Sequence, residues 1–189
     1  MTKNQTVNHK PMLPDSGTPY RQCVNCVMDT IGDPDISFDE NGICNYCYEY
    51  KKIEKATVFS GEEGNTKLKK IIAKIRKEGI KKQYDCLLGV SGGVDSSYLA
   101  YLAKENGLRP LIVHFDNGWD SELAVKNIEN LISKLGFELY TYVMDWEEFR
   151  ELQRSYFKAS VIDIEVPTDQ LIFGALFRLE KKYKIKYIL

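Results

Sequence analysis

Apolar and polar residues follow two different spacing patterns along the chain, and the pattern changes near residue 84. Before it, the stretch "NTKLKKIIAKIRKEG" places its leucine and three isoleucines at helical spacing, with Thr66 as the expected cap and Gly79 as the expected end. After it, short apolar runs of strand length alternate with longer amphipathic segments. The pattern predicts a helix that leads into a domain of strands and helices.

The spacing pattern after residue 84 predicts the order of the strands and helices. Strands are expected at 84–90, 109–116, 137–145 and 185–189, and helices at about 94–106 and 121–136. Strands joined through helices imply right-handed crossovers and a parallel sheet covered on both faces. We therefore predict a Rossmann-like α/β fold in which a ligand binds at the carboxyl ends of the strands.

Composition divides the chain into four parts. They are a polar tail at 1–20, a cysteine-rich module at 21–56, a basic amphipathic linker helix at 57–83 and the α/β domain at 84–189. Within the module, "ISFDENGICNYC" predicts a short strand and a turn at Asn41 and Gly42, and "YEYKKIEKA" predicts a helix. A chain of 189 residues can bury one sizeable core and a small satellite module.

Charge and hydropathy exclude some partners. The net charge of -1 gives no global attraction to nucleic acid or to an acidic membrane. No stretch approaches the roughly 18 apolar residues of a membrane span, and the N-terminus lacks the apolar segment of a signal peptide, so we expect a cytoplasmic protein without a membrane partner. The basic excess between Lys51 and Lys82 is more typical of a solvated helix face than of an RNA-binding patch, because few aromatic residues are interleaved with it.

Four of the five cysteines are paired by their spacing. Cys23 with Cys26 and Cys44 with Cys47 form two C-x2-C pairs at the separation typical of four-thiolate zinc sites. Two such pairs complete a tetrahedron with no open position, so the predicted Zn²⁺ is structural. A redox pair or plain core cysteines are the alternatives. The fifth, Cys86, lies inside an apolar run and is expected to be a small buried side chain.

Glycine and hydroxyl residues fill the junction between the first strand and the first helix of the α/β domain, "LLGVSGGVDSS". Gly92 and Gly93 permit a tight turn and let backbone N–H groups approach a ligand, while the following helix directs its positive N-terminus to the same place. Three serines can add hydroxyl donors: Ser91, Ser96 and Ser97. Asp95 suits either a bound Mg²⁺ or a helix cap. The loop matches neither the P-loop nor the dinucleotide fingerprint, but it predicts a phosphate site.

The motif "SGGVDS" resembles the pyrophosphate loop of the ATP pyrophosphatase superfamily. The resemblance implies that ATP is cleaved between its α and β phosphates, that AMP moves to a substrate oxygen, and that residues 91–97, Val94 among them, hold pyrophosphate. Asp95, with Mg²⁺, and Ser96 are the expected catalytic residues. The adenine is then expected against the ends of the first two strands, which adds three residues to the nucleotide site: Val90, His114 and Phe115. A histidine that merely packs at the strand end is the alternative for His114.

A narrower resemblance covers almost the whole chain. "CVNCVMDT", "FDENGICNYC", "SGGVDSSYLA", "HFDNGW", "AVKNIENLI", "DWEEFRELQRSYFKASV" and "PTDQ" together resemble the N-acetyl sugar amidotransferases of bacterial surface polysaccharide and flagellar glycan biosynthesis. The resemblance implies that an acetamido group, on a sugar carried by a nucleotide, is converted into an acetamidino group. It places the reaction in lipopolysaccharide or O-antigen biosynthesis.

The source of ammonia is expected outside this chain. Class I glutaminase chemistry needs a nucleophilic cysteine with a histidine partner. The chain offers only His9, in the tail, and His114, on a strand. The family resemblance implies a separate class I glutaminase subunit as a partner.

Loop residues after the second strand are candidates for substrate contacts. They are Asp116, Asn117 and Trp119, although an Asp-Asn-Gly turn with the tryptophan packed behind it accounts for them equally well. Asp169 in "VPTDQ" is a further candidate. Capping of the helix "QLIFGALFRLEKKY" by Thr168 or Asp169 is the alternative that the sequence favours.

Two other functions fit parts of the sequence. Because the chain stops at Leu189, within a predicted strand, we expect the sheet to be incomplete at this end and the fragment to be inactive alone. A tRNA thiolation enzyme would share the loop and the cysteine-rich module, but Cys86 is badly placed for its chemistry. A non-catalytic nucleotide-binding or zinc-ribbon adaptor is the second alternative.

Overall fold

The computed structural model describes residues 19–189, so residues 1–18 of the predicted tail, with His9, lie outside the described part. The chain forms two compact units, one ending at Asn65 and the other running from Thr66 to Leu189. Among the helices of residues 19–189, none combines the length and the apolar composition that crossing a bilayer requires.

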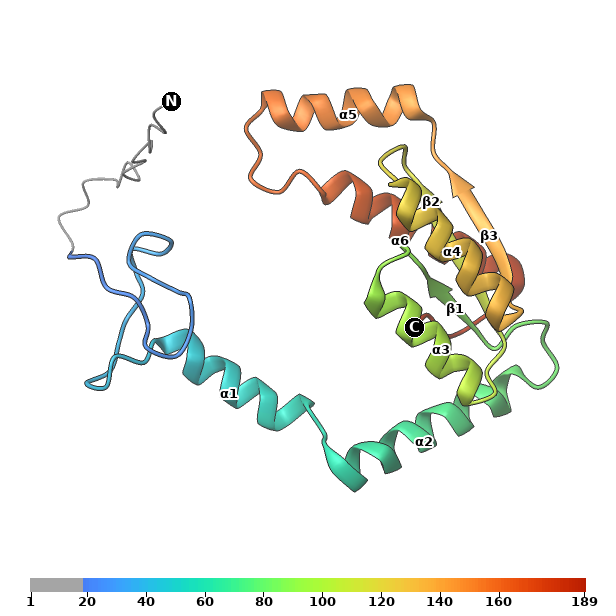
Figure 1. Ribbon diagram of the computed structural model, residues 1–189, viewed down its shortest axis with the longest axis horizontal. Helices are drawn as coiled ribbons and strands as arrows, with labels where there is room; N and C mark the ends of the chain where they lie inside the picture. The colour runs from blue at the N-terminus through green and yellow to red at the C-terminus, as the bar shows by residue number, and fades with distance from the viewer. Residues whose placement is uncertain (1–18) are drawn as a thin grey trace, which may run out of the picture. The chain divides into compact units, whose positions relative to one another are not determined.

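The first unit is built around cysteines rather than around large apolar side chains. Two antiparallel bridges shape it, Gln22 with Asp29 and Phe38 with Cys44, and helix α1 (Asn45–Thr57) follows directly (Figure 1). The predicted strand is therefore only a single bridge, whereas the predicted helix is present. The expected turn includes Gly42, whose φ of 81° is the left-handed conformation that glycine adopts readily. The buried core consists of four side chains: Cys23, Ile36, Cys44 and Cys47.

Helix α2 (Gly61–Gly79) corresponds to the helix predicted before the α/β domain. The prediction of Thr66 as its cap is wrong, because the helix already begins at Gly61. Glu62 and Glu63 in the first turn interact favourably with the positive end of the helix dipole, a signal the apolar spacing does not carry. The predicted end at Gly79 is confirmed. A Cβ atom at this position would lie 2.1 Å from Asp85 Oδ1, so only glycine fits here.

The second unit contains the predicted parallel sheet. Its strands are β1 (Cys86–Gly89), β2 (Pro110–Asp116) and β3 (Glu138–Val143), in the order β1-β2-β3. All pairs are parallel, with Leu88 opposite Ile112 and His114 opposite Thr141. Helices α3 (Val94–Glu105) and α4 (Glu122–Leu135) connect them, as the sequence predicts. The α/β class of the fold is confirmed.

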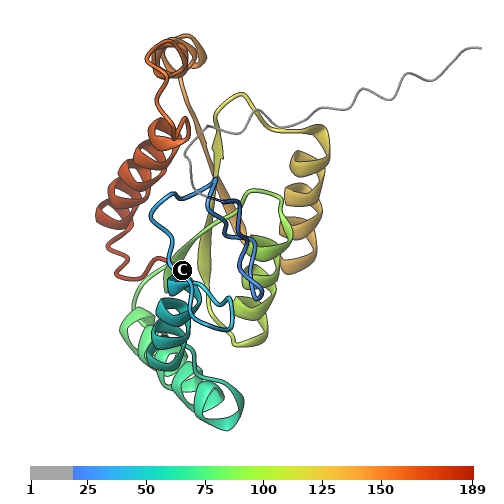
Figure 2. The ribbon, with the colours of Figure 1, turned by 90° about the vertical axis from the view of Figure 1, so that its left-hand side faces the viewer.

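Helices cover both faces of this sheet because successive strand residues point to opposite sides. Leu88 and Ile112 pack with residues of α3 and α4 on one face, and Leu87 and Val113 pack under α6 (Val166–Tyr183) on the other. Figure 2 shows the sheet between these two layers. Helix α5 (Trp146–Lys158) lies between β3 and α6 in the chain. The two-layer cover holds the carboxyl ends of β1 and β2 in a fixed position.

The predicted fourth strand is shorter than expected. Of residues 185–189, only Ile188 forms a bridge, parallel to Leu87 of β1. The Leu87 N–H donates to the Tyr187 carbonyl at 2.8 Å and the Leu189 N–H donates to the Leu87 carbonyl at 2.9 Å. The chain thus passes from β3 to the far side of β1. The strand order reverses beside β1, and in parallel sheets ligands bind at such a switch point.

Helix α6 begins before the expected cap. Glu165 is its N-cap residue, no side chain caps it in the described structure, and Pro167 lies in its first turn. The prediction that Thr168 or Asp169 caps the helix is therefore wrong. Proline has no backbone N–H, but at the start of a helix this N–H would have no partner within the helix. The dipeptide "VP" therefore indicates where α6 begins.

An ion pair between a buried carboxylate and a half-exposed guanidinium fixes the start of β1. The Asp85 side chain is 2% exposed, and its Oδ1 lies 2.6 Å from Arg109 Nη2. The same guanidinium donates to the Gly79 carbonyl at 2.8 Å and to the Lys82 carbonyl at 3.0 Å. The hydrogen bond from Asp85 raises the pKa of Arg109. The contacts join the end of α2 to β1 and to the start of β2.

We expect Asp85→Ala to lower the free energy of unfolding by about 2 kcal/mol, because it leaves the backbone N–H and the half-exposed guanidinium of Arg109 without their carboxylate acceptor. Chemical denaturation measures the change. The matched control is Glu151→Ala, which removes an exposed pair with Arg154 and should change stability by less than about 0.5 kcal/mol. Equal effects of the two variants would contradict the assignment of Asp85 as a structural anchor.

Candidate functional site

The glycine-rich loop follows β1 without a break in the sheet pairing. Val90 is buried, and its N–H donates to the Val113 carbonyl of β2 at 2.8 Å. Gly92 then turns with a φ of 75°, and a Cβ atom there would lie 2.4 Å from the Ala124 carbonyl oxygen. Asn127 Nδ2 donates to the Gly92 carbonyl at 3.0 Å. Glycine is therefore required at this position for both its conformation and the close approach of α4.

Two of the predicted hydroxyl donors converge in the loop. Ser96 Oγ accepts from the Ser91 N–H at 3.3 Å and lies 3.4 Å from Ser91 Oγ. The Ser97 hydroxyl donates to the Gly93 carbonyl at 2.7 Å, and the Ser96 hydroxyl donates to the same oxygen at the longer distance of 3.4 Å. Ser91 and Ser96 thus form the polar part of the loop, whereas Ser97 stabilises the first turn of α3.

The N-terminus of α3 differs from those of the next two helices in having no side-chain cap. Ser121 Oγ accepts the Ala124 N–H at the start of α4, and Asp145 Oδ1 accepts the Glu148 N–H at the start of α5. Gly93, the N-cap of α3, has no side chain to offer, and no other described side chain takes that place. The first-turn N–H groups and the helix dipole are therefore available to an anion.

Asp95 stands in this first turn and is exposed to solvent. A carboxylate oxygen is the type of ligand that Mg²⁺ prefers, and Asp95 would hold such an ion beside a bound phosphate. Val94 precedes it on the surface, 80% exposed, and contributes its backbone rather than its side chain to the loop.

A cavity of about 340 Å³ opens beside the loop at the carboxyl ends of β1 and β2. Its lining residues are Gly89, Val90, Ser91, Ser96, His114, Phe115, Asn117, Asp120, Thr168 and Ile172. Six of these were predicted nucleotide or substrate contacts. The volume lies within the range of small-molecule sites, and the position matches the rule for parallel sheets.

Four lining residues were not named as contacts, and apart from Gly89 at the end of β1 they were not expected from the sequence. Asp120 follows the loop after β2, and Thr168 and Ile172 come from α6. Thr168 is 8% exposed, although the sequence favoured it as a surface cap. Asp169, the predicted contact, is exposed and does not line the cavity. The early start of α6 is the signal that could have moved the expectation from Asp169 to Thr168.

His114 is both packed and part of the cavity wall. Its ring nitrogens lie 3.1 Å from the Val90 carbonyl oxygen and 3.1 Å from Asp120 Oδ2. A carbonyl can only accept, so Nδ1 is the nitrogen that donates to Val90, and Nε2 faces the Asp120 carboxyl group. The pair ties the end of β2 to the strand β1 that leads into the loop.

Asp116, Asn117 and Trp119 form the compact turn that the sequence offered as an alternative. Asp116 Oδ1 accepts the Gly118 N–H at 3.0 Å, and Asn117 Oδ1 accepts the Trp119 N–H at 3.1 Å. The Trp119 indole donates to Gln153 Oε1 at 2.7 Å. Asn117 lines the cavity described above, whereas Asp116 lines a second one of about 430 Å³ beside α4. Of the three, Asn117 is the one placed for contact with a nucleotide.

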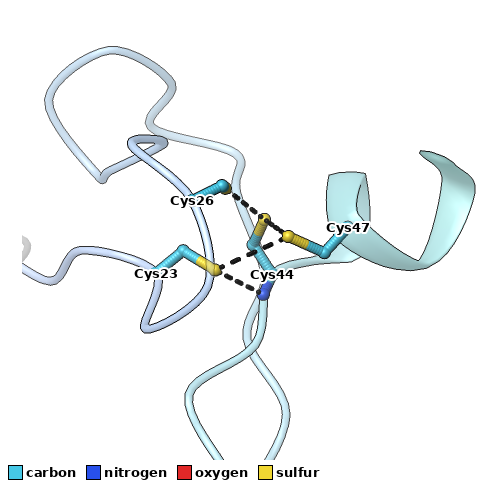
Figure 3. Close-up of side chains that lie close together, drawn as sticks. All are labelled: Cys23, Cys26, Cys44 and Cys47. Atoms are coloured by element: carbon cyan, nitrogen blue, oxygen red, sulfur yellow. Dashed lines mark hydrogen bonds between the residues drawn. The ribbon is translucent and has the colours of Figure 1, made fainter. Parts of the chain in front are cut away.

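The four module cysteines form one cluster (Figure 3). Their Sγ atoms all lie within 4.8 Å of one another, and all four are free thiols. Cys23 Sγ accepts two backbone N–H groups, from Asn25 at 3.4 Å and from Cys44 at 3.3 Å. Four sulfurs at tetrahedral spacing with N–H donors behind them fit a structural Zn²⁺, and they are the predicted set.

The electrostatics of the cluster favour a bound cation. Burial raises the pKa of the Cys23 thiol, but backbone N–H donors outweigh it and bring the pKa to about 6. A backbone N–H from Met28 lowers the pKa of Cys26, yet burial and the neighbouring thiols bring it to about 12. A bound metal ion would supply the positive charge that favours the thiolate form of its ligands.

We expect the purified protein to contain about one equivalent of zinc, and Cys44→Ser to lose most of it because a closed tetrahedral site needs all four thiolates. Metal analysis by mass spectrometry measures both. Cys86→Ala is the matched control, since Cys86 is fully buried in the other unit and should leave the zinc content unchanged. Full zinc content in Cys44→Ser would exclude the four-thiolate site.

Gly92→Ala should lower the free energy of unfolding by about 2 kcal/mol and abolish measurable ATP binding, because alanine meets both the positive φ and the α4 backbone. Denaturation and calorimetric titration test the two effects. Gly174→Ala is the control, since a Cβ there meets nothing within 4 Å and alanine favours the helix by about 0.5 to 1 kcal/mol. Wild-type ATP affinity in Gly92→Ala would show that the loop does not bind the nucleotide.

No family model matches the chain. Among curated proteins it is similar to tRNA(Ile)-lysidine synthase of Chlamydia pneumoniae, with 36% identity over 102 residues, 52% of this chain and 31% of that protein. It is also similar to tRNA-specific 2-thiouridylase MnmA 2 of Fusobacterium nucleatum subsp. nucleatum, with 27% identity over 109 residues, 54% of this chain and 32% of that protein. The chain spans about a third of the length of these relatives.

Two solved structures are similar to the fold. One is NMN synthetase from Francisella tularensis, with a TM-score of 0.48, 19% identity, and 68% of this chain and 53% of that chain covered. The other is the NH3-dependent NAD synthetase from Campylobacter jejuni subsp. jejuni, with a TM-score of 0.47, 16% identity, and coverage of 65% and 54%.

The loop geometry, the parallel sheet and the similarity to these two curated enzymes agree with the resemblance of the loop to the PP-loop ATP pyrophosphatase superfamily. They leave the acceptor open, because a sugar amidotransferase is not among the relatives described. The superfamily resemblance seen in "SGGVDS" therefore has support, whereas the narrower resemblance stays a prediction.

Proposed function

We propose that this protein contributes to an ATP-dependent, AMP-forming amidotransferase that converts the acetamido group of an N-acetyl sugar into an acetamidino group. The observation that carries the nucleotide half is the uncapped, glycine-rich N-terminus of α3 beside a cavity at the strand ends. The acceptor half is supported by the sequence resemblance to N-acetyl sugar amidotransferases. A sugar carried by a nucleotide is the proposed substrate.

The chemistry has two steps. The acetamido oxygen attacks the α phosphorus of ATP, the bond between the α and β phosphates breaks, and pyrophosphate leaves as the amide nitrogen loses its proton. Ammonia then attacks the activated carbon, AMP departs with the former amide oxygen, and the released protons go to solvent. Adenylation is needed because an amide oxygen is a poor leaving group without it.

Each group of residues has a proposed role in these steps. The loop N–H groups with Ser91 and Ser96 hold pyrophosphate and stabilise the charge that develops on it. Asp95 would hold Mg²⁺, which neutralises phosphate charge when bound. Val90, Phe115 and the residues beside them hold the nucleoside. The four-cysteine cluster stabilises the first unit and takes no part in the chemistry.

Ammonia is proposed to come from a separate glutaminase subunit. The α/β unit has one cysteine, Cys86, which is fully buried in β1. Burial and the nearby Asp85 carboxylate raise the pKa of this thiol to about 12, so it is neither accessible nor ionised. An accessible cysteine nucleophile of the class I glutaminase type is therefore absent from the described part of this unit.

Modification of tRNA is the second candidate, because both curated relatives are tRNA-modifying enzymes by name. Such an enzyme would activate a base in place of a sugar amide with the same loop. Thiolation through a cysteine in the α/β unit conflicts with the burial of Cys86. The addition of another nucleophile does not conflict with it, so the acceptor must be tested directly.

The test combines the protein with ATP, Mg²⁺, ammonium and acetamido sugars labelled with ¹⁸O in the carbonyl. We expect AMP that carries the label, together with an acetamidino sugar lighter than its unlabelled acetamido precursor by about one dalton, because the amide oxygen leaves on AMP while NH replaces it. Mass spectrometry measures both products. Asp95→Asn, which keeps the size of the side chain, should reduce AMP release by about 100-fold or more.

The other outcomes are equally informative. AMP release that depends on tRNA and on no sugar would replace the first candidate with the second. Tight ATP binding without AMP under any of these conditions would favour an adaptor that binds nucleotide without turning it over. Labelled AMP from the sugar excludes both.

A further inference from the structure

The cavity of about 430 Å³ beside α4 has no role in the nucleotide site, and its lining comes from β2, β3 and α4. In the parallel register Leu139 of β3 lies opposite Ile112 of β2, and Thr141 lies opposite His114. Alternate strand residues share a face, so Leu139 and Thr141 lie on the face where Ile112 packs with Ile128 of α4. The cavity is therefore a groove between α4 and β3.

The lining of this groove is accessible to a ligand, because α4 covers β2 more completely than β3. Ile128 of α4 is 3% exposed, whereas Val125 of the same helix is 42% exposed and Leu139 of β3 is 39% exposed. Thr141 on the strand and Glu129 on the helix are also exposed. The groove thus offers an apolar floor and polar side chains that a molecule from solvent can contact.

Most polar groups of the groove are hydrogen-bond acceptors. Three carboxylates line it, those of Asp116, Asp120 and Glu129, together with the Thr141 hydroxyl. Asp116 Oδ1 already accepts the Gly118 N–H at 3.0 Å, so Oδ2 is the oxygen it offers to a ligand. An ionised carboxylate only accepts hydrogen bonds, and it repels phosphate. The ligand must therefore supply O–H or N–H donors and carry no phosphate at this place.

The size of the groove distinguishes between two ligands with such donors. A single ammonium ion is about as large as a water molecule, which occupies about 30 Å³ in the liquid, and would leave most of the space empty. A volume of about 430 Å³ lies in the range of small-molecule sites and accommodates a sugar ring with its substituents. The floor of Val125 and Leu139 suits the C–H groups of such a ring.

The groove also adjoins the cavity beside the glycine-rich loop. His114 and Asp120 line both, and His114 Nε2 lies 3.1 Å from Asp120 Oδ2. In the proposed reaction an acetamido oxygen must approach the α phosphorus of ATP, and reacting atoms need to come within about 3 to 3.5 Å. Two cavities that meet at one pair of side chains bring an acceptor and a nucleotide next to each other.

We propose that the groove between α4 and β3 binds the sugar ring of the acceptor. The hydroxyl groups of the sugar donate to Asp116 and Glu129, Thr141 adds a further hydrogen bond, and the acetamido group is directed towards the pair of His114 and Asp120. The carboxylates keep the phosphates of a nucleotide carrier outside the groove. The inference rests on the proposed function, for which it supplies the acceptor site.

Two variants on opposite sides of the groove test the site. Thr141→Val keeps the shape of the side chain and removes the hydroxyl, and Glu129→Gln keeps the size and removes the charge. The probes are the methyl glycosides of N-acetylglucosamine and N-acetylgalactosamine, titrated without ATP and followed by protein NMR. We expect at least one glycoside to bind the wild type, and each variant to raise its Kd about 3- to 10-fold. The Kd of ATP should stay unchanged.

Glu122→Gln is the matched control, because Glu122 is an exposed carboxylate of the same helix that lies outside the cavity lining. It should leave the Kd values of the glycosides and of ATP unchanged. Thr141→Val should also be as stable as the wild type in denaturation, since valine is favoured at a strand position. A weaker glycoside complex then reflects the lost hydroxyl and not a damaged fold.

The proposal is overturned if neither glycoside binds the wild type at millimolar concentrations, or if both variants bind them as the wild type does. It is also overturned if the variants weaken ATP as much as the glycosides, or if Glu129→Gln weakens only the binding of ammonium.

The assay with labelled sugars separates this site from the proposed function. Labelled AMP from a sugar whose binding neither variant affects would overturn the site and leave the function in place. Glycoside binding with the expected effects of both variants, but without labelled AMP, would support the site and remove only the reaction.

Discussion

The contact between the Gly92 backbone and Ala124 is the constraint on which the site depends. It brings the loop so close to α4 that a single added carbon atom has no space. The loop cannot move away from α4, because Asn127 holds the Gly92 carbonyl and Val90 continues the pairing of β1 with β2. Gly93 follows directly as the N-cap of α3 and has no side chain that could cap the helix. The packing of Gly92 therefore fixes where α3 begins, and the glycine at position 93 leaves its first N–H groups free.

The parts of the site that the sequence predicted are those encoded locally. The strand, the glycines and the serines of residues 84–97 are neighbours in the chain, and their spacing alone defines a turn with donors. Asp120 and Thr168 escaped prediction because their place depends on contacts distant in sequence: Asp120 through His114, and Thr168 through the packing of α6 on the sheet. Contacts between residues distant in sequence cannot be predicted from composition or from the spacing of apolar residues.

The errors in the predicted elements have a similar origin. The apolar positions of α2 define only the part of the helix that packs, so its polar first turn from Gly61 was not expected. The segment 185–189 has strand composition, but only Ile188 pairs with β1. The spacing of apolar residues indicates which residues face a core. It does not indicate where a helix ends or how many residues of a strand pair with a neighbour. The cysteine cluster was predictable because the geometry of zinc fixes the spacing of its ligands.

The cavity is lined both by the loop after β1 and by α6, and this also affects how the protein folds. Residues of the loop and of α6 are far apart in the chain, and contacts of this kind form late because a long segment must be ordered first. A ligand that touches both walls binds only the completed structure and so stabilises it by mass action. The cellular concentration of such a ligand would then help to set the fraction of chains in which α6 is docked. The resistance of α6 to protease would follow the nucleotide supply.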